Sequence, residues 1–395
     1  MRNEAIASLL VVAIVVGAGA GYLFGSANER TVTSVSTFVT TSTFTNTFVS
    51  TSVRTTTTTV NSATTIIWGT PIPISSVETG NVSVGGNAIA VNPNDNRIYV
   101  AGGSNVLTVV DSVSHTIVAR ITLPAPSNAG IAIDYKTGTV YALVEGGVAV
   151  VNGSTSTVVK ELQVDFGYKS IAFDSSTDVL YGSPETISYS ATNPVGYLVG
   201  VDARTGAVVA NVSIGFWAND IVVNQQLNLI YGVGCAQSFF CDSMVSVLNG
   251  TNAKLVNETR LGSAYYATAT IDEKTGIVYV SGEAQLVALN PYGTVIFNDS
   301  PDTCGAFIGM ADDPALNQVI MAPQNYNYIL VYSGWFGNLL NMYSLPDAPQ
   351  YVAFNPATNE TYALVSESLL AFHGLASTGH VNDTLIGAGQ SCLPP

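Results

Sequence analysis

An aliphatic residue followed by tyrosine recurs along most of this chain, and its spacing restricts the possible folds more than any other feature of the sequence. Each pair follows the previous one after 40 to 50 residues, and the segments between them are strand-like runs and turns. A period of this length without helical segments is typical of the blades of a β-propeller. The pairs are Ile98-Tyr99, Val140-Tyr141, Leu180-Tyr181, Ile230-Tyr231, Val278-Tyr279 and the weaker Thr361-Tyr362, while Val319-Ile320 holds the same place without a tyrosine.

Each repeat has the same internal order. An apolar segment lies before the tyrosine landmark, as Ile89-Ala90-Val91 does in the first repeat, and an Asn or Asp then begins a turn. Asx side chains hydrogen-bond their own backbone two residues further on, which suits hairpin turns. A third and a fourth strand-like segment follow, so the repeats predict an all-β, seven-bladed β-propeller. The turn residues are Asn92, Asp134, Asp174, Asn224, Asp272, Asp312 and Asn355.

The repeats also resemble a known family. The stretch 98–123 reads IYVAGGSNVLTVVDSVSHTIVARITL, and the stretch 140–164 reads VYALVEGGVAVVNGSTSTVVKELQV. Both are similar to the YVTN-type β-propeller repeat, which has Tyr-Val, then Val-x-Val-Asp, then Thr-x-x-Val and a closing apolar strand. The resemblance covers residues 70–395 and implies the fold, but such propellers serve many functions.

A propeller exposes two strand edges unless its first and last blades are joined. The segment 72–84 (IPISSVETGNVSV) resembles a third or outer strand, and we expect it to complete the seventh blade. The segment 379–387 (GHVNDTLIG) also has the pattern of an outer strand and is the alternative.

The N-terminal region, residues 1–24, contains a predicted membrane anchor. Residues 5–24 form a run of 20 residues without a charge, enough to cross a hydrocarbon core of about 30 Å. Arg2 before this run favours a cytoplasmic N-terminus, which places the rest of the chain outside. A cleaved signal peptide is the alternative, because small residues at 18–20 and 25–27 offer cleavage sites.

Residues 25–65 read as a stalk between the anchor and the propeller at 66–395. Between residues 31 and 65 there are 22 Ser or Thr and a single charge. Such tracts resemble O-glycosylated stalks, and a linker without sugar is the alternative. The predicted location is therefore the cell membrane, with a single pass and an extracellular propeller.

Acidic residues outnumber basic ones, with 27 Asp and Glu against 12 Lys and Arg and a net charge of −15. A nucleic-acid-binding protein needs a basic surface, so this composition argues against a nucleic-acid partner. The expected partners are the membrane, through the N-terminal helix, and a glycan, peptide or surface-protein ligand.

Four cysteines in an exported chain indicate two disulfides. Cys235 and Cys241 belong to one loop and are predicted to pair. Cys304 before the sixth inner strand and Cys392 in the C-terminal tail form the second predicted pair. A metal site is the alternative for these cysteines, but no CxxC motif occurs and the three histidines lack ligand spacing.

One face of the predicted ring has features of a contact surface. In a propeller the loops between second and third strands share a face with the connections between blades, and two such loops are long, at 182–197 and 232–243. Aromatic residues on that face suit the binding of sugars, peptides or apolar ligands, although they also suit packing between blades. The ligand-contact candidates are Tyr168, Phe216, Trp217, Phe239, Phe240, Tyr265 and Tyr266.

Sequons for N-glycosylation are predicted to avoid that face. In the predicted arrangement of strands, the sequons fall on outer strands or on turns at the opposite face, and none lies in the two long loops. The glycosylation candidates are Asn81, Asn152, Asn211, Asn249, Asn257, Asn298, Asn359 and Asn382.

The sequence contains no convincing catalytic set. None of the three histidines stands in a motif for Ser-His-Asp chemistry, and neither a Gly-rich phosphate loop nor a CxxCH haem motif occurs. We therefore expect no cofactor and no catalytic residue, and we predict a cell-surface binding or scaffolding module. A lactonase-like hydrolase on the propeller scaffold and a structural cell-envelope component remain the alternatives.

Overall fold

The computed structural model describes residues 72–73, 78–167, 170–184, 196–235, 242–263, 268–282, 285–299, 307–337 and 339–373. These residues belong to one compact unit, Gly69–Pro395. The predicted anchor and stalk lie outside the described residues. Within the described part of the chain, no helix has the length and apolar character needed to span a membrane.

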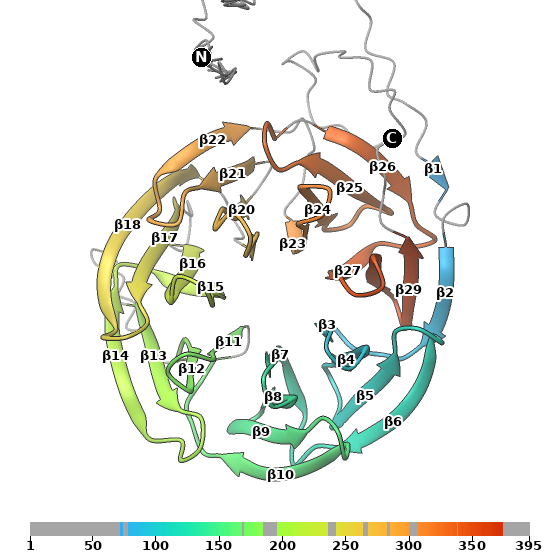
Figure 1. Cartoon of the computed structure of the whole chain (residues 1–395), viewed down its shortest axis with the longest axis horizontal. Helices are drawn as coiled ribbons and strands as arrows, with labels where there is room; N and C mark the ends of the chain where they lie inside the picture. The colour runs from blue at the N-terminus through green and yellow to red at the C-terminus, as the bar shows by residue number, and fades with distance from the viewer. Residues whose placement is uncertain are drawn as a thin grey trace, which may run out of the picture. The chain divides into compact units, whose positions relative to one another are not determined.

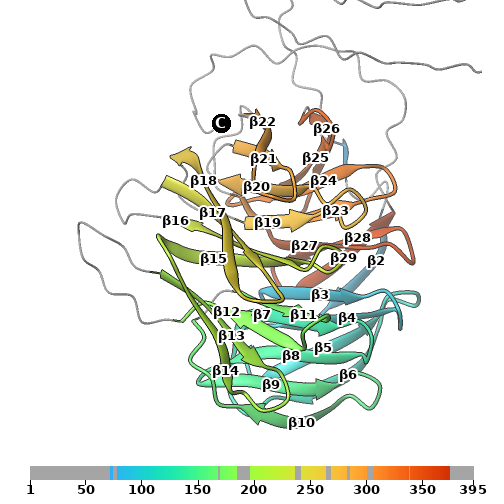
Figure 2. The same ribbon diagram turned by 60° about the vertical axis from the view of Figure 1, so that its left-hand side comes forward.

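The described residues form seven sheets arranged around a centre, so the fold is an all-β, seven-bladed propeller as predicted (Figure 1). Six sheets have four antiparallel strands, and one has a fifth, parallel strand at its edge. The blades follow one another around the ring in chain order, which a view from a second direction also shows (Figure 2).

The strands of the first four blades have the following bounds. Blade 1 consists of β3 (Ala88–Asn92), β4 (Arg97–Ala101), β5 (Val106–Asp111) and β6 (Thr116–Thr122). Blade 2 consists of β7 (Ser127–Asp134), β8 (Thr139–Val144), β9 (Gly147–Asn152) and β10 (Thr157–Leu162). Blade 3 consists of β11 (Ile171–Asp174), β12 (Val179–Gly182), β13 (Gly196–Asp202) and β14 (Val208–Ile214). Blade 4 consists of β15 (Trp217–Asn224), β16 (Leu229–Cys235), β17 (Asp242–Asn249) and β18 (Lys254–Ser263).

The remaining blades include the two N-terminal strands. Blade 5 consists of β19 (Thr268–Ile271), β20 (Val278–Gly282), β21 (Gln285–Leu289) and β22 (Val295–Asp299). Blade 6 consists of β23 (Phe307–Asp313), β24 (Gln318–Pro323), β25 (Tyr328–Ser333) and β26 (Leu339–Ser344), with β1 (Ile72–Pro73) added at its outer edge. Blade 7 consists of β27 (Pro349–Asn355), β28 (Glu360–Val365), β29 (Ser368–His373) and β2 (Glu78–Ser83).

The apolar core lies between the blades. Seven clusters of buried residues occur, and each combines side chains from two neighbouring blades. Burial of apolar surface stabilises by roughly 25 cal/mol per Å², so each blade depends on its two neighbours for its largest stabilising term.

The tyrosine landmarks lie on second strands and join adjacent blades. Tyr231 donates its hydroxyl hydrogen to the carbonyl of Pro291 at 2.7 Å, and Tyr279 donates to the carbonyl of Gly334 at 3.0 Å. A Cβ at Gly334 would lie 2.5 Å from the Tyr279 hydroxyl oxygen, so only glycine permits this approach. Tyr231 and Tyr279 are therefore hydrogen-bonded links to the next blade as well as core side chains, whereas the buried hydroxyl group of Tyr99 has no hydrogen-bond partner among the described residues.

The predicted closure by the N-terminal segment is confirmed. Strand β2 pairs antiparallel with β29, and Val82 lies opposite Leu369. The sequence did not predict β1, which pairs in parallel with β26 in blade 6. The alternative closing segment, 379–387, lies outside the described residues.

One predicted turn is displaced by a residue. In blade 6 the turn was expected to begin at Asp312, but the carboxylate of Asp313 accepts the backbone hydrogen bonds of Ala315 and Leu316. Strand β23 continues through Asp312, which pairs with Val319. Two consecutive acidic residues look alike in a sequence, and only their hydrogen bonds distinguish the one that caps the turn.

Candidate ligand site in the central cavity

A cavity of about 190 Å³ lies among the inner strands of the seven blades. Each blade contributes two consecutive residues to its lining. The first residue of each pair lies four residues before the Asn or Asp that begins the first turn of that blade, and we call these seven residues the cavity ring. The cavity ring consists of Ala88, Gly130, Ser170, Asp220, Thr268, Gly309 and Tyr351.

Asp220 is the one charged side chain in this lining, and it joins three blades. Its Oδ1 accepts a hydrogen bond from Ser170 Oγ of blade 3 at 2.8 Å and one from the N–H of Ile221 at 2.9 Å. Its Oδ2 accepts from Thr268 Oγ1 at 3.1 Å and from the N–H of Ala269 at 2.9 Å, both in blade 5. These four donors hold the carboxyl group in a fixed position beside the cavity.

The environment of Asp220 disfavours its charge. Burial raises the pKa of its carboxyl group, and the hydrogen bonds that it accepts oppose this effect without cancelling it. The ion pairs between described residues are those of His115 with Glu360 and of Arg204 with Asp178. Asp220 is thus a carboxylate without a neighbouring cation in the described part of the chain.

Tyr351 belongs to blade 7, on the opposite side of the ring from blade 4 (Figure 1). Burial raises the pKa of its hydroxyl group, and the negative charge of Asp220 raises it further. The two side chains therefore share one electrostatic environment, with a phenol on one side of the cavity and a carboxyl group on the other.

The cavity ring lies near the start of the inner strands. Ala88 and Thr268 are the first residues of β3 and β19, and Ser170 directly precedes β11. In a propeller this end of the inner strands is the face that carries the connections between blades. Three predicted contact residues, Tyr168, Trp217 and Tyr266, come two or three residues before the cavity-ring residues of blades 3, 4 and 5.

The described residues include two of the predicted ligand-contact aromatics. Phe216 is fully buried in the cluster between blades 3 and 4, with Leu198 and Ile214 nearby in that cluster, so it packs between blades and is not available to a ligand. Trp217 is half-buried and pairs with Cys235 in the ladder of blade 4. The other five candidates, Tyr168, Phe239, Phe240, Tyr265 and Tyr266, lie outside the described residues.

The second long loop is shorter than predicted. The sequence placed a loop at 232–243, but β16 continues to Cys235 and β17 begins at Asp242, with Cys235 opposite Ser243. No free cysteine occurs in the described part of the chain. Cys241, Cys304 and Cys392 lie outside it, so the pairs 235–241 and 304–392 stay predictions.

The strand positions of the described sequons agree with the predicted map. Asn81, Asn211, Asn257 and Asn298 lie on the fourth strands β2, β14, β18 and β22. Asn152 and Asn249 end third strands, and Asn359 lies in the first turn of blade 7. Asn382 lies outside the described residues, and glycosylation at any of these sites stays a prediction.

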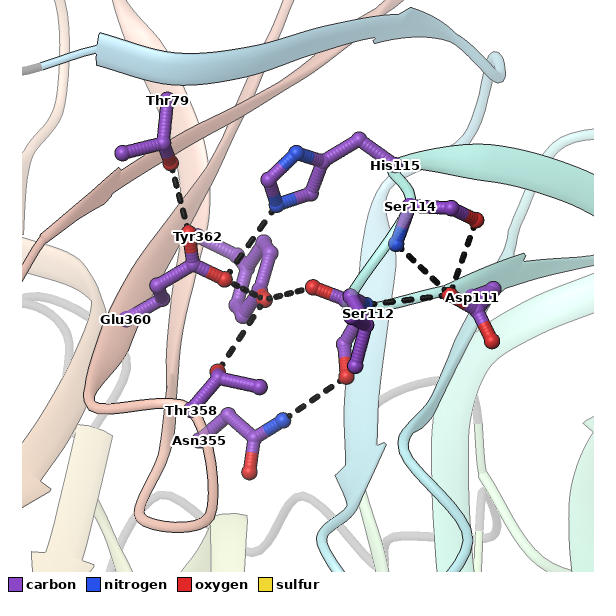
Figure 3. A network of polar contacts seen from close by, with 10 residues as sticks. Thr79, Asp111, Ser112, Ser114, His115, Asn355, Thr358, Glu360 and Tyr362 are labelled. Atoms are coloured by element: carbon purple, nitrogen blue, oxygen red, sulfur yellow. Dashed lines mark hydrogen bonds and ion pairs between the residues drawn. The ribbon is translucent and has the colours of Figure 1, made fainter.

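A second polar network fastens blade 7 to blade 1 (Figure 3). Thr79 on β2 donates to Glu360 Oε1 at 2.7 Å, Tyr362 donates to Glu360 Oε2 at 2.6 Å, and Nε2 of His115 lies 3.2 Å from the same Oε2. Burial disfavours the charged carboxylate of Glu360, but its three hydrogen bonds outweigh burial and hold its pKa below the usual value. The network links the closing strand, β28 and the third turn of blade 1.

Several carboxyl groups at the junction of blades 5 and 6 lie close enough to influence one another. Burial, together with the charges of Asp272 and Asp313, raises the pKa of Asp312 to about 8. Among the residues that the structure describes, no group of three or more His, Cys, Asp or Glu is placed to hold a metal ion.

Sequence reasoning missed Asp220, Thr268 and Tyr351. A signal existed, because aligning the repeats on their turn-opening Asx brings the cavity ring into one column, provided that the blade 6 turn begins at Asp313 and not at the predicted Asp312. That column reads Ala, Gly, Ser, Asp, Thr, Gly and Tyr. The Asp is its one charged residue, and a charged residue is unusual on an inner strand because such strands are largely buried.

Comparison with known proteins supports the fold. A structure of hydrazine synthase from Kuenenia stuttgartiensis is similar, with a TM-score of 0.63 and 12% identity over 78% of this chain and 99% of that chain. The Cps50 (Swd1) β-propeller domain from Myceliophteria thermophila is similar with a TM-score of 0.59 and 9% identity, over 75% of this chain and 98% of that domain. No protein-family model and no curated protein matches the sequence. At such low identities these similarities show that the chain has the propeller fold, and nothing about its ligand.

Proposed function

We propose that this chain is a binding module displayed outside a membrane, and that the propeller takes its ligand at the cavity ring. The observation that carries the proposal is the set of polar side chains in one central cavity. Ser170, Asp220 and Thr268 form a connected cluster from three consecutive blades, and Tyr351 lines the cavity from the opposite blade. A few fixed polar groups that converge on one concave site are the usual arrangement for ligand recognition.

Display outside the membrane rests on the sequence. The uncharged run 5–24 serves as the anchor, and the Ser/Thr-rich segment 25–65 serves as the stalk. The described sequons lie on outer strands or on turns away from the start of the inner strands, which leaves the mouth beside the cavity ring clear of the proposed glycans.

The resemblance of the repeats to the YVTN-type pattern supports the same proposal in a general way. Propellers with such repeats present a rigid ring, and the ligand is chosen by residues at the channel and in the loops. The predicted contact residue Trp217, three residues before Asp220 on β15, then belongs to the outer part of a site whose inner part is the cavity ring.

The test is a glycan and peptide binding screen with the full chain in detergent. We expect a ligand whose binding is weakened at least tenfold by Asp220→Asn. Asp202→Asn should leave that binding unchanged, because Asp202 ends the third strand of blade 3 and does not line the cavity. Ligands that bind both variants and the unmodified chain equally would place the site elsewhere. Fractionation of the protein in the soluble phase would contradict the anchor.

A further inference from the structure

We propose, building on the binding function above, that the cavity ring recognises a primary ammonium group carried on an alkyl chain, such as a lysine side chain or an alkylamine. The residues that carry this inference are Asp220 and its two hydroxyl neighbours, Ser170 and Thr268.

The charge of the cavity favours a cation. Asp220 is the single charged side chain in the lining, and it accepts hydrogen bonds from neutral hydroxyl and backbone N–H donors. A carboxylate removed from water and lacking a counter-charge is costly to maintain. A cation that enters the cavity gains the full interaction with a carboxylate whose position is already fixed, so little ordering is required on binding.

The acceptors match the donors of a primary ammonium group. Ser170 and Thr268 both donate to Asp220, and each hydroxyl oxygen retains a lone pair that can accept a hydrogen bond. The carboxylate already accepts four hydrogen bonds, so it supplies the negative charge while the two hydroxyl oxygens beside it supply the acceptors. An –NH₃⁺ group has three donors, whereas a quaternary ammonium has none.

The rest of the lining favours an organic cation over a metal ion. The second residue of each lining pair is apolar, as Ile89, Ile131 and Val352 illustrate. Calcium and magnesium require about six or more oxygen ligands or retained waters. Several of these apolar side chains, Ile171 and Ile221 among them, are buried in the clusters between blades and do not add oxygen ligands. Within the described residues, one carboxylate that already accepts four hydrogen bonds does not supply such a set.

The size of the cavity limits what enters it. Pockets that enclose a whole drug-sized ligand have volumes of roughly 300–1,000 Å³. The central cavity has about 190 Å³, which accommodates one end group while the remainder of the ligand extends along the channel. Tyr351 then lies beside the cation, where an aromatic ring adds a favourable interaction.

The experiment compares four small probes on the full chain in detergent by saturation-transfer NMR. The probes are n-butylammonium, n-butanol, butyrate and butyltrimethylammonium, which differ in the charge and donors of one end group. We expect n-butylammonium to bind at least tenfold more tightly than the other three. Equal binding of n-butanol and n-butylammonium, or no binding of n-butylammonium, overturns the proposal without any variant being needed.

Variants locate the probe. Asp220→Asn is expected to abolish the preference for n-butylammonium, and Asp202→Asn, which neutralises an exposed carboxylate in an outer turn, is expected to preserve it. Circular dichroism verifies that the Asp220→Asn variant folds. If that variant does not fold, Ser170→Ala, which removes one acceptor, takes its place, and we expect it to weaken the binding of n-butylammonium at least threefold. Retention of the preference in the folded variant overturns the assignment to Asp220.

The outcome also separates this inference from the proposed function. A glycan or peptide that binds at the cavity, is displaced by neither alkyl cation and is weakened by Asp220→Asn overturns the ammonium class and leaves the binding module intact. Failure of both the screen and the four probes overturns both.

Discussion

Asp312 Oδ1 is buried, and no donor in the described part of the chain contacts it. Burial, together with the charges of Asp272 and Asp313, raises the pKa of Asp312 to about 8. A carboxyl group with a raised pKa takes up a proton on folding, so its contribution to stability is complete below its ordinary pKa, near 4, and is lost as the pH rises toward 8.

The variant Asp312→Asn removes this proton uptake. We expect it to be more stable than the unmodified chain by up to about 5 kcal/mol at pH 8 and nearly equal to it at pH 4, since folding raises this pKa from 3.8 to about 8 and one pKa unit corresponds to about 1.4 kcal/mol. Urea denaturation at pH 4, 6 and 8 measures the difference. A gain that does not depend on pH would show that the carboxyl group is not the cause.

The matched control is Asp202→Asn, for which the opposite sign is expected. Hydrogen bonds from Thr205 and Arg204 lower the pKa of this exposed carboxyl group. A lowered pKa stabilises the fold above the ordinary pKa, so neutralising Asp202 should lower stability at pH 6 and 8.

Phe216 and Trp217 are neighbours in the sequence with different surroundings. Phe216 is fully buried between blades 3 and 4, whereas Trp217 is half-buried. We expect Phe216→Ala to lower the free energy of unfolding by about 3–5 kcal/mol, and Trp217→Ala to lower it less. Thermal denaturation of the two variants checks this, and equal losses would mean that Trp217 is also a packing residue.

At the scale of the strand, β2 is the element on which closure depends. Its ladder with β29 is supplemented by the Thr79 hydroxyl group, which reaches the second strand of blade 7 at Glu360. Thr79→Val removes the hydrogen bond and keeps the shape of the side chain. We expect a loss of about 1–2 kcal/mol and faster hydrogen exchange of the β2 amides.

The control is Ser83→Ala on the same strand, where the side chain is exposed. Because the pKa of Glu360 is held below its usual value, the stabilisation from this network is present above about pH 4.5 and is lost as the pH falls through the lowered pKa. Faster exchange in Ser83→Ala, or an effect of Thr79→Val that persists at pH 3, would contradict this role for Thr79.

The strands could be predicted from the sequence where the same buried residue type recurs in each blade. Tyr99, Tyr231 and Tyr279 are fully buried second-strand residues, and each recurs because every blade offers the same contact to the next. The cavity ring was not predictable in the same way. Its members share a position but not a chemical character, since Gly130 and Asp220 line the same cavity.

The prediction of contact residues shows a further limit. The sequence predicts the aromatic residues on one face as ligand contacts. It does not separate a fully buried aromatic residue such as Phe216 from a half-buried one such as Trp217. The parallel strand β1 was missed because two residues, Ile72 and Pro73, are too few to give a period.

At the scale of the whole molecule, the ring is stable only when it is continuous. Each apolar cluster lies between two blades, so one open junction exposes two blade faces at once. The junction between blades 7 and 1 joins the two ends of the propeller. The chain crosses it from β2 in blade 7 to β3 in blade 1, and Val82 of β2 packs against the buried cluster there.

Truncation tests this dependence on β2. A chain that begins at residue 69, the start of the compact unit, retains β1 and β2, whereas a chain that begins at residue 84 lacks both. We expect the first to melt at the temperature of the full chain and the second to melt roughly 10 °C lower, because the loss of a strand costs several kcal/mol and about 1 kcal/mol shifts the melting temperature by 2–4 °C in a domain of this size. The exposed edge of β29 should also make the shorter chain associate, which light scattering detects. Equal melting temperatures and a monomeric shorter chain would mean that another segment closes the ring.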